Sequence, residues 1–162
     1  MARVIRPVVA ADLPEVEREL TTHWGGVRIW SLGRMHRADE LPGFVAEVDG
    51  RFAGLVTYTI DGGAWQGEVI TLSSRAEDGG VGTALLAAAT EAIRAAGCRR
   101  AYLTTTNDNT RAIGFYQRRG WRLASLRLGA VDAARERSPG IPLRGLNGID
   151  IHDEIEFERP LA

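Results

Sequence analysis

The sequence contains no lysine: all 20 of its basic residues are arginines. It has a single cysteine, Cys98, which excludes an internal disulfide and is expected to be a partly buried structural thiol. It also lacks an apolar run long enough to cross a membrane. The formal net charge is only −1 and the isoelectric point is near 6.3, so no overall field attracts nucleic acid or an anionic membrane. These absences predict a soluble protein that binds neither.

The length and the N-terminal segment predict one cytoplasmic domain. At 162 residues, of which 44% are hydrophobic, the chain can bury one core, and we expect a single domain over residues 1–162. The opening segment, MARVIRPVVAADLPEVEREL, changes from a strand pattern to a polar helix too early for a secretory signal, so we expect no targeting segment. We expect no metal, and the sequence leaves a homodimer open.

The segment from Gly67 to Gly97 is typical of a buried strand, a glycine-rich turn and a long helix. The glycines of the turn lack side chains that would keep an anion from the backbone N–H groups opening the helix, where the dipole favours a phosphate. A nucleoside-triphosphate loop is disfavoured because Gly82 is followed by Thr83 and Ala84, not by Lys and Ser or Thr. The alternative is a turn that merely connects strand and helix.

A second strand and helix follow this unit. Residues 100–105 have strand propensity, and the order strand, helix, strand implies a right-handed parallel crossover. Asn109 is a suitable N-cap for a helix over 109–118, which Gly120 ends. We expect a mixed, mostly antiparallel α/β (α+β) sheet of six to seven strands with helices on both faces. The expected strands are 3–9, 43–49, 52–60, 66–73, 99–105, 121–128 and 153–159, the other helices are 11–22 and 80–96, and 129–151 is a long loop.

Two motifs together resemble a known family. GGVGTALL, from Gly79 to Leu86, and the later pattern Asn109-x-x-Ala112-x-x-Phe115-Tyr116-x-x-x-Gly120-Trp121 are similar to the two signature segments of GNAT-type N-acetyltransferases. The matching part covers roughly residues 64 to 128. The resemblance implies acetyl-CoA as the acetyl donor and a primary amine as the acceptor.

The resemblance also implies positions for the cofactor and for catalysis. By this resemblance, the backbone N–H near Ile70 would donate to the oxyanion, and Tyr116 would protonate the departing thiolate. Asn109 would contact coenzyme A and also cap its helix. Where the family usually has Arg or Gln, this chain has Glu77, which would repel pyrophosphate unless it points away or Arg75 neutralises it. The backbone positions expected to bind pantetheine are Leu72, Ser73 and Ser74, and those expected to bind pyrophosphate are Asp78, Gly79, Gly80, Val81, Gly82 and Thr83.

Attack on a thioester needs an amine that has lost its proton, so the reaction needs a base. Glu68 is the candidate for this base. Its apolar strand neighbours would bury it and raise its pKa, and it shares a face with Ile70 and Leu72. The alternative is a solvent-facing glutamate on an edge strand. In the histone-modifying branch of the family the base lies further upstream, at the position that Gln66 occupies in this chain, which is on the same face of the strand as Glu68. For Tyr116 the alternative role is simple core packing.

The acceptor site is less well marked by the sequence. The candidate acceptor-binding residues are Trp24, Arg28, Trp30, His152 and Asp153, although tryptophans at this spacing are commonly core residues and a histidine beside an aspartate commonly pairs locally. Acidic residues of the tail would attract a cationic acceptor. Two alternatives to an enzyme remain open: a non-catalytic acyl-CoA-binding sensor or regulatory module, and a structural or interaction domain without a coenzyme A site.

Overall fold

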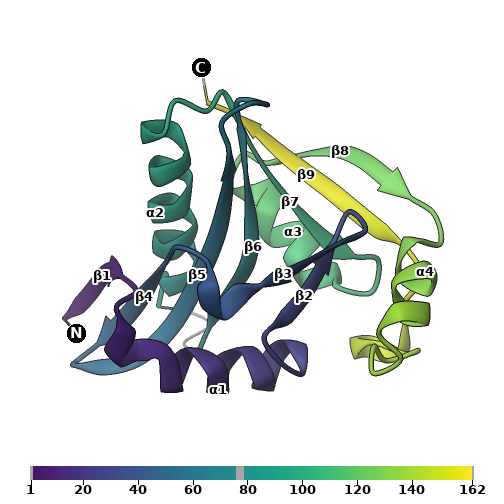
Figure 1. Ribbon diagram of the computed structural model, residues 1–162, viewed down its shortest axis with the longest axis horizontal. Helices are drawn as coiled ribbons and strands as arrows, with labels where there is room; N and C mark the ends of the chain where they lie inside the picture. Colours follow the sequence, from purple (N-terminus) through teal and green to yellow (C-terminus); the bar gives the residue numbers. More distant parts are fainter. Residues whose placement is uncertain (1, 76–78, 162) are drawn as a thin grey trace.

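The computed structural model describes residues 2–75 and 79–161, shown in Figure 1. The strands are β1 (Arg3–Pro7), β2 (Arg28–Ser31), β3 (Arg34–Arg37), β4 (Gly43–Val48), β5 (Arg51–Asp61), β6 (Gln66–Ser74), β7 (Arg100–Thr106), β8 (Arg122–Arg127) and β9 (Glu154–Pro160). The helices are α1 (Leu13–Trp24), α2 (Val81–Ala95), α3 (Thr110–Arg118) and α4 (Ala130–Arg137). None of the helices in the described ranges is long and apolar enough to span a membrane.

Seven strands form one mixed sheet in the order β1-β4-β5-β6-β7-β9-β8. Its parallel pair is β6 with β7, and the other neighbours run antiparallel. Helix α2 is the crossover between the two parallel strands, and it lies along the sheet in Figure 1. This confirms the expected mixed, mostly antiparallel sheet.

Helices cover both faces of the sheet, as expected. One core gathers buried residues of α2, such as Leu85 and Ile93, with Phe157 of β9, and side chains of α3 pack against it. Gly67 makes the close approach of α2 to β6 possible, since a Cβ there would lie 2.7 Å from a methyl carbon of Ile93. A smaller core on the other face joins α1 to β4 and β5.

Two elements differ from the expectations. The segment before residue 40 forms an antiparallel hairpin, β2 with β3, which lies beside the large sheet on the side of α1 (Figure 1). The expected long loop at 129–151 contains helix α4. The N–H of Gly129, at the start of this helix, donates to the Asp153 carboxylate at 2.9 Å, so a contact distant in sequence fixes the helix.

Candidate active site at the divergence of β6 and β7

The parallel strands β6 and β7 separate in the middle of the sheet. Their ladder ends where Val69 pairs with Leu103, although both strands continue beyond these residues. At the same place the register between β5 and β6 steps by one residue, from the pair Thr57 and Thr71 to the pair Tyr58 and Val69. Ile70 is therefore the extra residue of a β-bulge, a feature that bends a strand and redirects its backbone. The separation leaves part of β6 facing a gap in the sheet.

Backbone groups of β6 beyond the bulge point into this gap. The N–H of Arg75 donates to the carbonyl of Ala53 at 2.8 Å, so this residue's backbone is directed toward β5. Because successive residues of a strand direct their backbone groups to opposite sides, those of Leu72 and Ser74 face away from β5, toward the gap. The backbone of Ser73, the third position expected to bind pantetheine, is directed toward β5 and its side chain is buried.

The glycine-rich turn leads from β6 to the first turn of α2. Gly80 has a φ of +69°, a left-handed conformation that glycine adopts without strain, and it immediately precedes Val81, the buried first residue of the helix. The expected pyrophosphate positions from Gly79 to Thr83 thus form an exposed turn and a helix N-terminus. Asp78 and Glu77 lie outside the described residues.

Two arginines contact this turn from distant parts of the chain. Arg3 of β1 donates to the carbonyl of Gly79 at 2.9 Å. Arg119, at the end of α3, donates through Nε to the hydroxyl of Thr83 at 2.7 Å. These cations add positive charge beside the N-terminus of α2. Arg75 instead pairs with the α1 carboxylates Glu15 and Glu19, at 3.4 and 2.9 Å.

Glu68 is buried just before the bulge. Its side chain is only 4% exposed, and its carboxylate accepts a hydrogen bond from the Ser31 hydroxyl of β2. The Tyr102 hydroxyl of β7, the neighbouring residue in the ladder, is a second hydrogen-bond partner. Burial raises the pKa of Glu68 above its ordinary value, the two hydroxyls oppose the shift, and the nearby carboxylates Glu154 and Glu156 add to it. The environment therefore makes Glu68 a stronger base than an exposed glutamate.

Three glutamates of β9 lie on the same side of the sheet as Glu68. Glu156 is bound by Arg100, and by Arg127 at 2.8 Å. Burial also raises the pKa of Glu154, whose Oε2 accepts a hydrogen bond from the N–H of Leu32 at 3.3 Å. The third, Glu158, pairs with Arg100 and Arg122. The arginines thus neutralise two of the three carboxylates.

Tyr116 projects from α3 into an aromatic cluster. Its ring centroid lies 5.6 Å from that of Phe157 and 6.2 Å from that of Trp121. Burial raises the pKa of the Tyr116 hydroxyl to about 12, so the phenol holds its proton at neutral pH. Tyr116 therefore packs against the core. Asn109 caps α3 as expected, its Oδ1 accepting the N–H of Ala112 at 3.2 Å.

The five candidate acceptor residues are scattered. Trp24 packs against the small core under α1, and Arg28 is exposed at the start of β2. Trp30 of β2 lies under the guanidinium of Arg137 from α4, with 5.8 Å between the Arg137 Cζ and the ring centroid. His152 is exposed and lies 3.4 Å from the Asp132 carboxylate, whereas Asp153 binds the start of α4. Trp30 lies on the strand that supplies Ser31.

Sequence reasoning missed the hydroxyl groups around Glu68. Ser31, Tyr102 and Thr104 come from β2 and β7, and the Ser31 and Thr104 hydroxyls are 2.9 Å apart. The alternation of Arg100, Tyr102 and Thr104 with the buried residues Ala101 and Leu103 could have shown that β7 has a polar face. No comparable signal marks Ser31, because its contact depends on how the hairpin packs.

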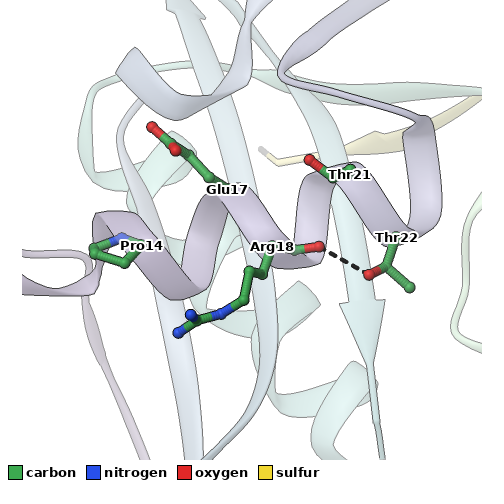
Figure 2. Close-up of a pocket in the computed structure, with 5 residues that line it drawn as sticks. All are labelled: Pro14, Glu17, Arg18, Thr21 and Thr22. Carbon is green, nitrogen blue, oxygen red and sulfur yellow. Dashed lines mark hydrogen bonds between the residues drawn. The ribbon is translucent and has the colours of Figure 1, made fainter.

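The depression on the outer face of α1 is a different kind of surface. It is lined by five exposed residues on one side of the helix, and Figure 2 shows them pointing outward, with the Thr22 hydroxyl donating to the carbonyl of Arg18 at 2.9 Å. The lining residues are Pro14, Glu17, Arg18, Thr21 and Thr22. None of them takes part in the contacts of Glu68 or of the glycine-rich turn, so this depression has no part in the candidate active site.

Comparison with known proteins identifies the family. The chain matches the model of the acetyltransferase (GNAT) family over residues 10–121. It is 45% identical to the protein YdhI of Bacillus subtilis (strain 168) over 138 residues, which are 85% of each chain. The structure of nourseothricin acetyltransferase superposes with a TM-score of 0.72 at 22% identity, covering 100% of both chains. That of a GNAT family acetyltransferase from Elizabethkingia anophelis with acetyl-CoA bound superposes with a TM-score of 0.69 at 16% identity, covering 98% of each. This chain belongs to the acetyltransferase (GNAT) family.

Proposed function

We propose that the chain is an N-acetyltransferase that transfers the acetyl group of acetyl-CoA to a primary amine of a small molecule or peptide. The amine attacks directly, in a ternary complex, and the reaction takes place in the cytoplasm. The observation that carries the proposal is the separation of β6 from β7 at the bulged Ile70, two residues after the buried Glu68. It brings a candidate base next to backbone groups of β6 that lie beyond the ladder with β7, as acyl transfer to an amine requires.

The residues around the gap fit acetyl-CoA, which supplies an activated acetyl group when bound. The outward backbone groups of Leu72 and Ser74 suit the amide groups of the pantetheine arm. The glycine-rich turn and the N-terminus of α2, from Gly79 to Thr83, with Arg3 and Arg119 beside them, suit the pyrophosphate. The acetyl-CoA-bound structure with the same fold supports this assignment.

Glu68 would act as the general base. An ammonium ion has no lone pair, so a carboxylate must take a proton from the acceptor, directly or through a water molecule, before the nitrogen can attack. A raised pKa makes a carboxylate a better proton acceptor at neutral pH, provided that it is still ionised. Glu68 and Ile70 are two residues apart on β6, at the place where β6 and β7 separate, so the base and the acetyl carbonyl can lie close together.

Ile70 and Tyr116 would stabilise the charges that develop. The backbone N–H of Ile70, redirected by the bulge, would donate to the carbonyl oxygen as it becomes negative. Tyr116 would donate its phenolic proton to the departing sulfur, since a phenol with a pKa of about 12 stays protonated until a stronger base forms beside it. A buried phenol without this role would serve only to pack α3 against the core.

The test is a thiol-release screen with acetyl-CoA and a panel of polyamines, amino acids, aminoglycosides and peptides with free N-termini. We expect release with at least one amine, and loss of that release in the variants Glu68→Gln and Tyr116→Phe. Glu17→Gln, on the outer face of α1, is the matched control and should retain release. Binding of acetyl-CoA without release on any amine would favour the non-catalytic sensor, and absence of binding would refute both coenzyme A functions.

A further inference from the structure

The candidate base Glu68 is covered by the β2–β3 hairpin. Glu68 is 4% exposed, and Ser31 of the hairpin, which is also 4% exposed, donates a hydrogen bond to its Oε2. A carboxylate covered in this way offers little surface that an amine could touch directly. The proton that the base must accept therefore needs a path through the groups that cover Glu68.

Two hydroxyl groups lead from Glu68 toward the place where β6 and β7 separate. The Ser31 hydroxyl, besides its bond to Glu68, is 2.9 Å from the hydroxyl of Thr104 on β7. Thr104 follows Leu103, the last residue of β7 in the ladder with β6, so it occupies the position across the gap from Ile70. Thr104 is only partly buried, whereas Ser31 and Glu68 are buried. The chain of hydrogen bonds thus runs from the gap to the base.

This chain is satisfied in both protonation states of Glu68. A carboxylate only accepts hydrogen bonds, and each hydroxyl has one proton to donate. With Glu68 ionised, Ser31 donates to Glu68 and Thr104 donates to Ser31. With Glu68 protonated, the directions reverse, so that Glu68 donates to Ser31 and Ser31 donates to Thr104. A proton can therefore pass along the chain without the loss of a hydrogen bond, as a relay requires.

With Glu68 ionised, the Thr104 oxygen can receive a proton from the gap. Its own proton is then donated to Ser31, and in residues 2–75 and 79–161 no other group donates a hydrogen bond to it. The ammonium group of the acceptor is a donor that fits this oxygen. Ile70, whose N–H we assign to the oxyanion, lies across the gap, so an amine bound to Thr104 would also lie near the acetyl carbonyl.

We propose that Thr104 and Ser31 relay the proton of the acceptor amine to Glu68. The inference rests on the proposed function, in which Glu68 is the general base. One N–H bond of the ammonium breaks and its proton bonds to the Thr104 oxygen, while the Thr104 proton passes to Ser31 and the Ser31 proton passes to Oε2 of Glu68. The electron pair of the broken bond stays on the nitrogen and is the pair that attacks. Both hydroxyls are restored, and Glu68 ends as a carboxylic acid.

Other titratable and charged groups also face Glu68. They are Tyr102 of β7, with Arg100 beside it, and Glu154 and Glu156 of β9. Tyr102 keeps its proton at neutral pH, because burial and the charge of Glu68 raise its pKa to about 12, and Glu156 is paired with Arg100. Glu154 also lies near Thr104, so it is the alternative end of a relay. Glu154→Gln should retain the rate of acetyl transfer, and a loss as large as that in Glu68→Gln would overturn the assignment to Glu68.

The kinetic test measures acetyl transfer in a single turnover, with the amine that gives the fastest thiol release. Thr104→Val replaces the hydroxyl with a methyl group that fills the same space. General acid–base catalysis contributes about 10²–10⁴-fold, so the maximal rate should fall by about a hundredfold, with the Kd for acetyl-CoA unchanged. Thr104→Ser keeps the hydroxyl and should retain most of the rate. Thr59→Val removes a hydroxyl beside Glu68 in the β5–β6 ladder but outside the chain, and should leave the rate unchanged.

Mixtures of light and heavy water give a readout that a merely structural role of Thr104 would not move. When several protons move in one step, the rate falls along a curve as the deuterium fraction rises, whereas a single proton gives a straight line. We expect a curve for the wild type and a straight line for Thr104→Val. A weaker dependence on the amine with an unchanged maximal rate in Thr104→Val would make Thr104 an acceptor-binding group only and overturn the relay.

A titration of the free protein tests the inner half of the relay without substrate. The pKa of Glu68, followed by carbon-13 NMR of its carboxyl carbon, should rise in Ser31→Ala, because a hydroxyl binds a carboxylate more strongly than a neutral acid. An unchanged pKa would show that Ser31 does not contact Glu68, which would overturn the relay and leave the proposed function standing. A wild type that releases no thiol with any amine would refute the proposed function, and the relay with it.

Discussion

Gly82→Ala should stabilise the protein and weaken the binding of acetyl-CoA. Gly82 is the second residue of α2, and a Cβ built there would lie 3.5 Å from Phe115 and 3.8 Å from Ser74, both ordinary van der Waals distances. The fold therefore has room for a methyl group. That methyl group would, however, lie between α3 and the end of β6, on the surface that we propose binds the pyrophosphate end of the cofactor.

The two effects have opposite signs and can be estimated separately. Replacing a helical glycine with alanine gains about 0.5–1 kcal/mol of unfolding free energy, mainly because the unfolded chain loses freedom. Displacing a phosphate from a backbone N–H removes a hydrogen bond to a charged group, about 1.5–3 kcal/mol. By the usual conversion, the Kd for acetyl-CoA should rise roughly tenfold to a hundredfold.

The assays are urea denaturation for stability and isothermal titration calorimetry for acetyl-CoA. Thr21→Ala is the matched control: it raises helix propensity by about 0.5 kcal/mol on the exposed face of α1 shown in Figure 2, away from the gap, and should leave the Kd unchanged. A stabilised Gly82→Ala protein that binds acetyl-CoA as tightly as the wild type would refute the placement of the pyrophosphate. A destabilised one would show that the space beside Phe115 is too small.

Three further predictions concern stability and are measured by urea denaturation. Asn109→Ala removes the N-cap of α3 and should lower the unfolding free energy by about 1 kcal/mol; an unchanged value would mean that the cap contributes nothing. Phe157→Ala empties the centre of the larger core and should cost about 3–5 kcal/mol, and a cost below 1 kcal/mol would contradict its central place. Because burial raises the pKa of folded Glu68 above its ordinary 4.5, ionisation opposes folding, so wild-type stability relative to Glu68→Gln should fall as pH rises from 4.5 through the folded pKa. A difference that grew with pH would contradict this sign.

The sequence was sufficient for the parts of the fold that local patterns determine. The glycine-rich turn and the cap at Asn109 are local features, so both were predictable and both occur in the structure. The burial of Glu68 also followed from its apolar neighbours in the strand. The bulge at Ile70 did not, because a bulge is a property of how two strands pair and not of one strand alone.

Elements held by distant contacts could not be predicted. Gly129, the residue that caps the N-terminus of helix α4, donates its N–H to the carboxylate of Asp153, a residue 24 positions later. The short strands of the β2–β3 hairpin contact the large sheet through Ser31, whose partners Glu68 and Thr104 come from other strands. A sequence pattern shows that a residue is polar, but not which distant strand will face it. The groups that surround the candidate base were therefore visible only in the structure.

The measurement that tests the central claim most directly is thiol release from acetyl-CoA, followed for the wild type and Glu68→Gln on the same amine panel, with acetyl-CoA binding measured in parallel. We predict that both proteins bind acetyl-CoA and that the wild type releases thiol with at least one amine. We further predict that Glu68→Gln loses this release at neutral pH. Equal release by the two proteins, or binding by the wild type with no release on any amine, would contradict a catalytic site built on Glu68 at the divergence of β6 and β7.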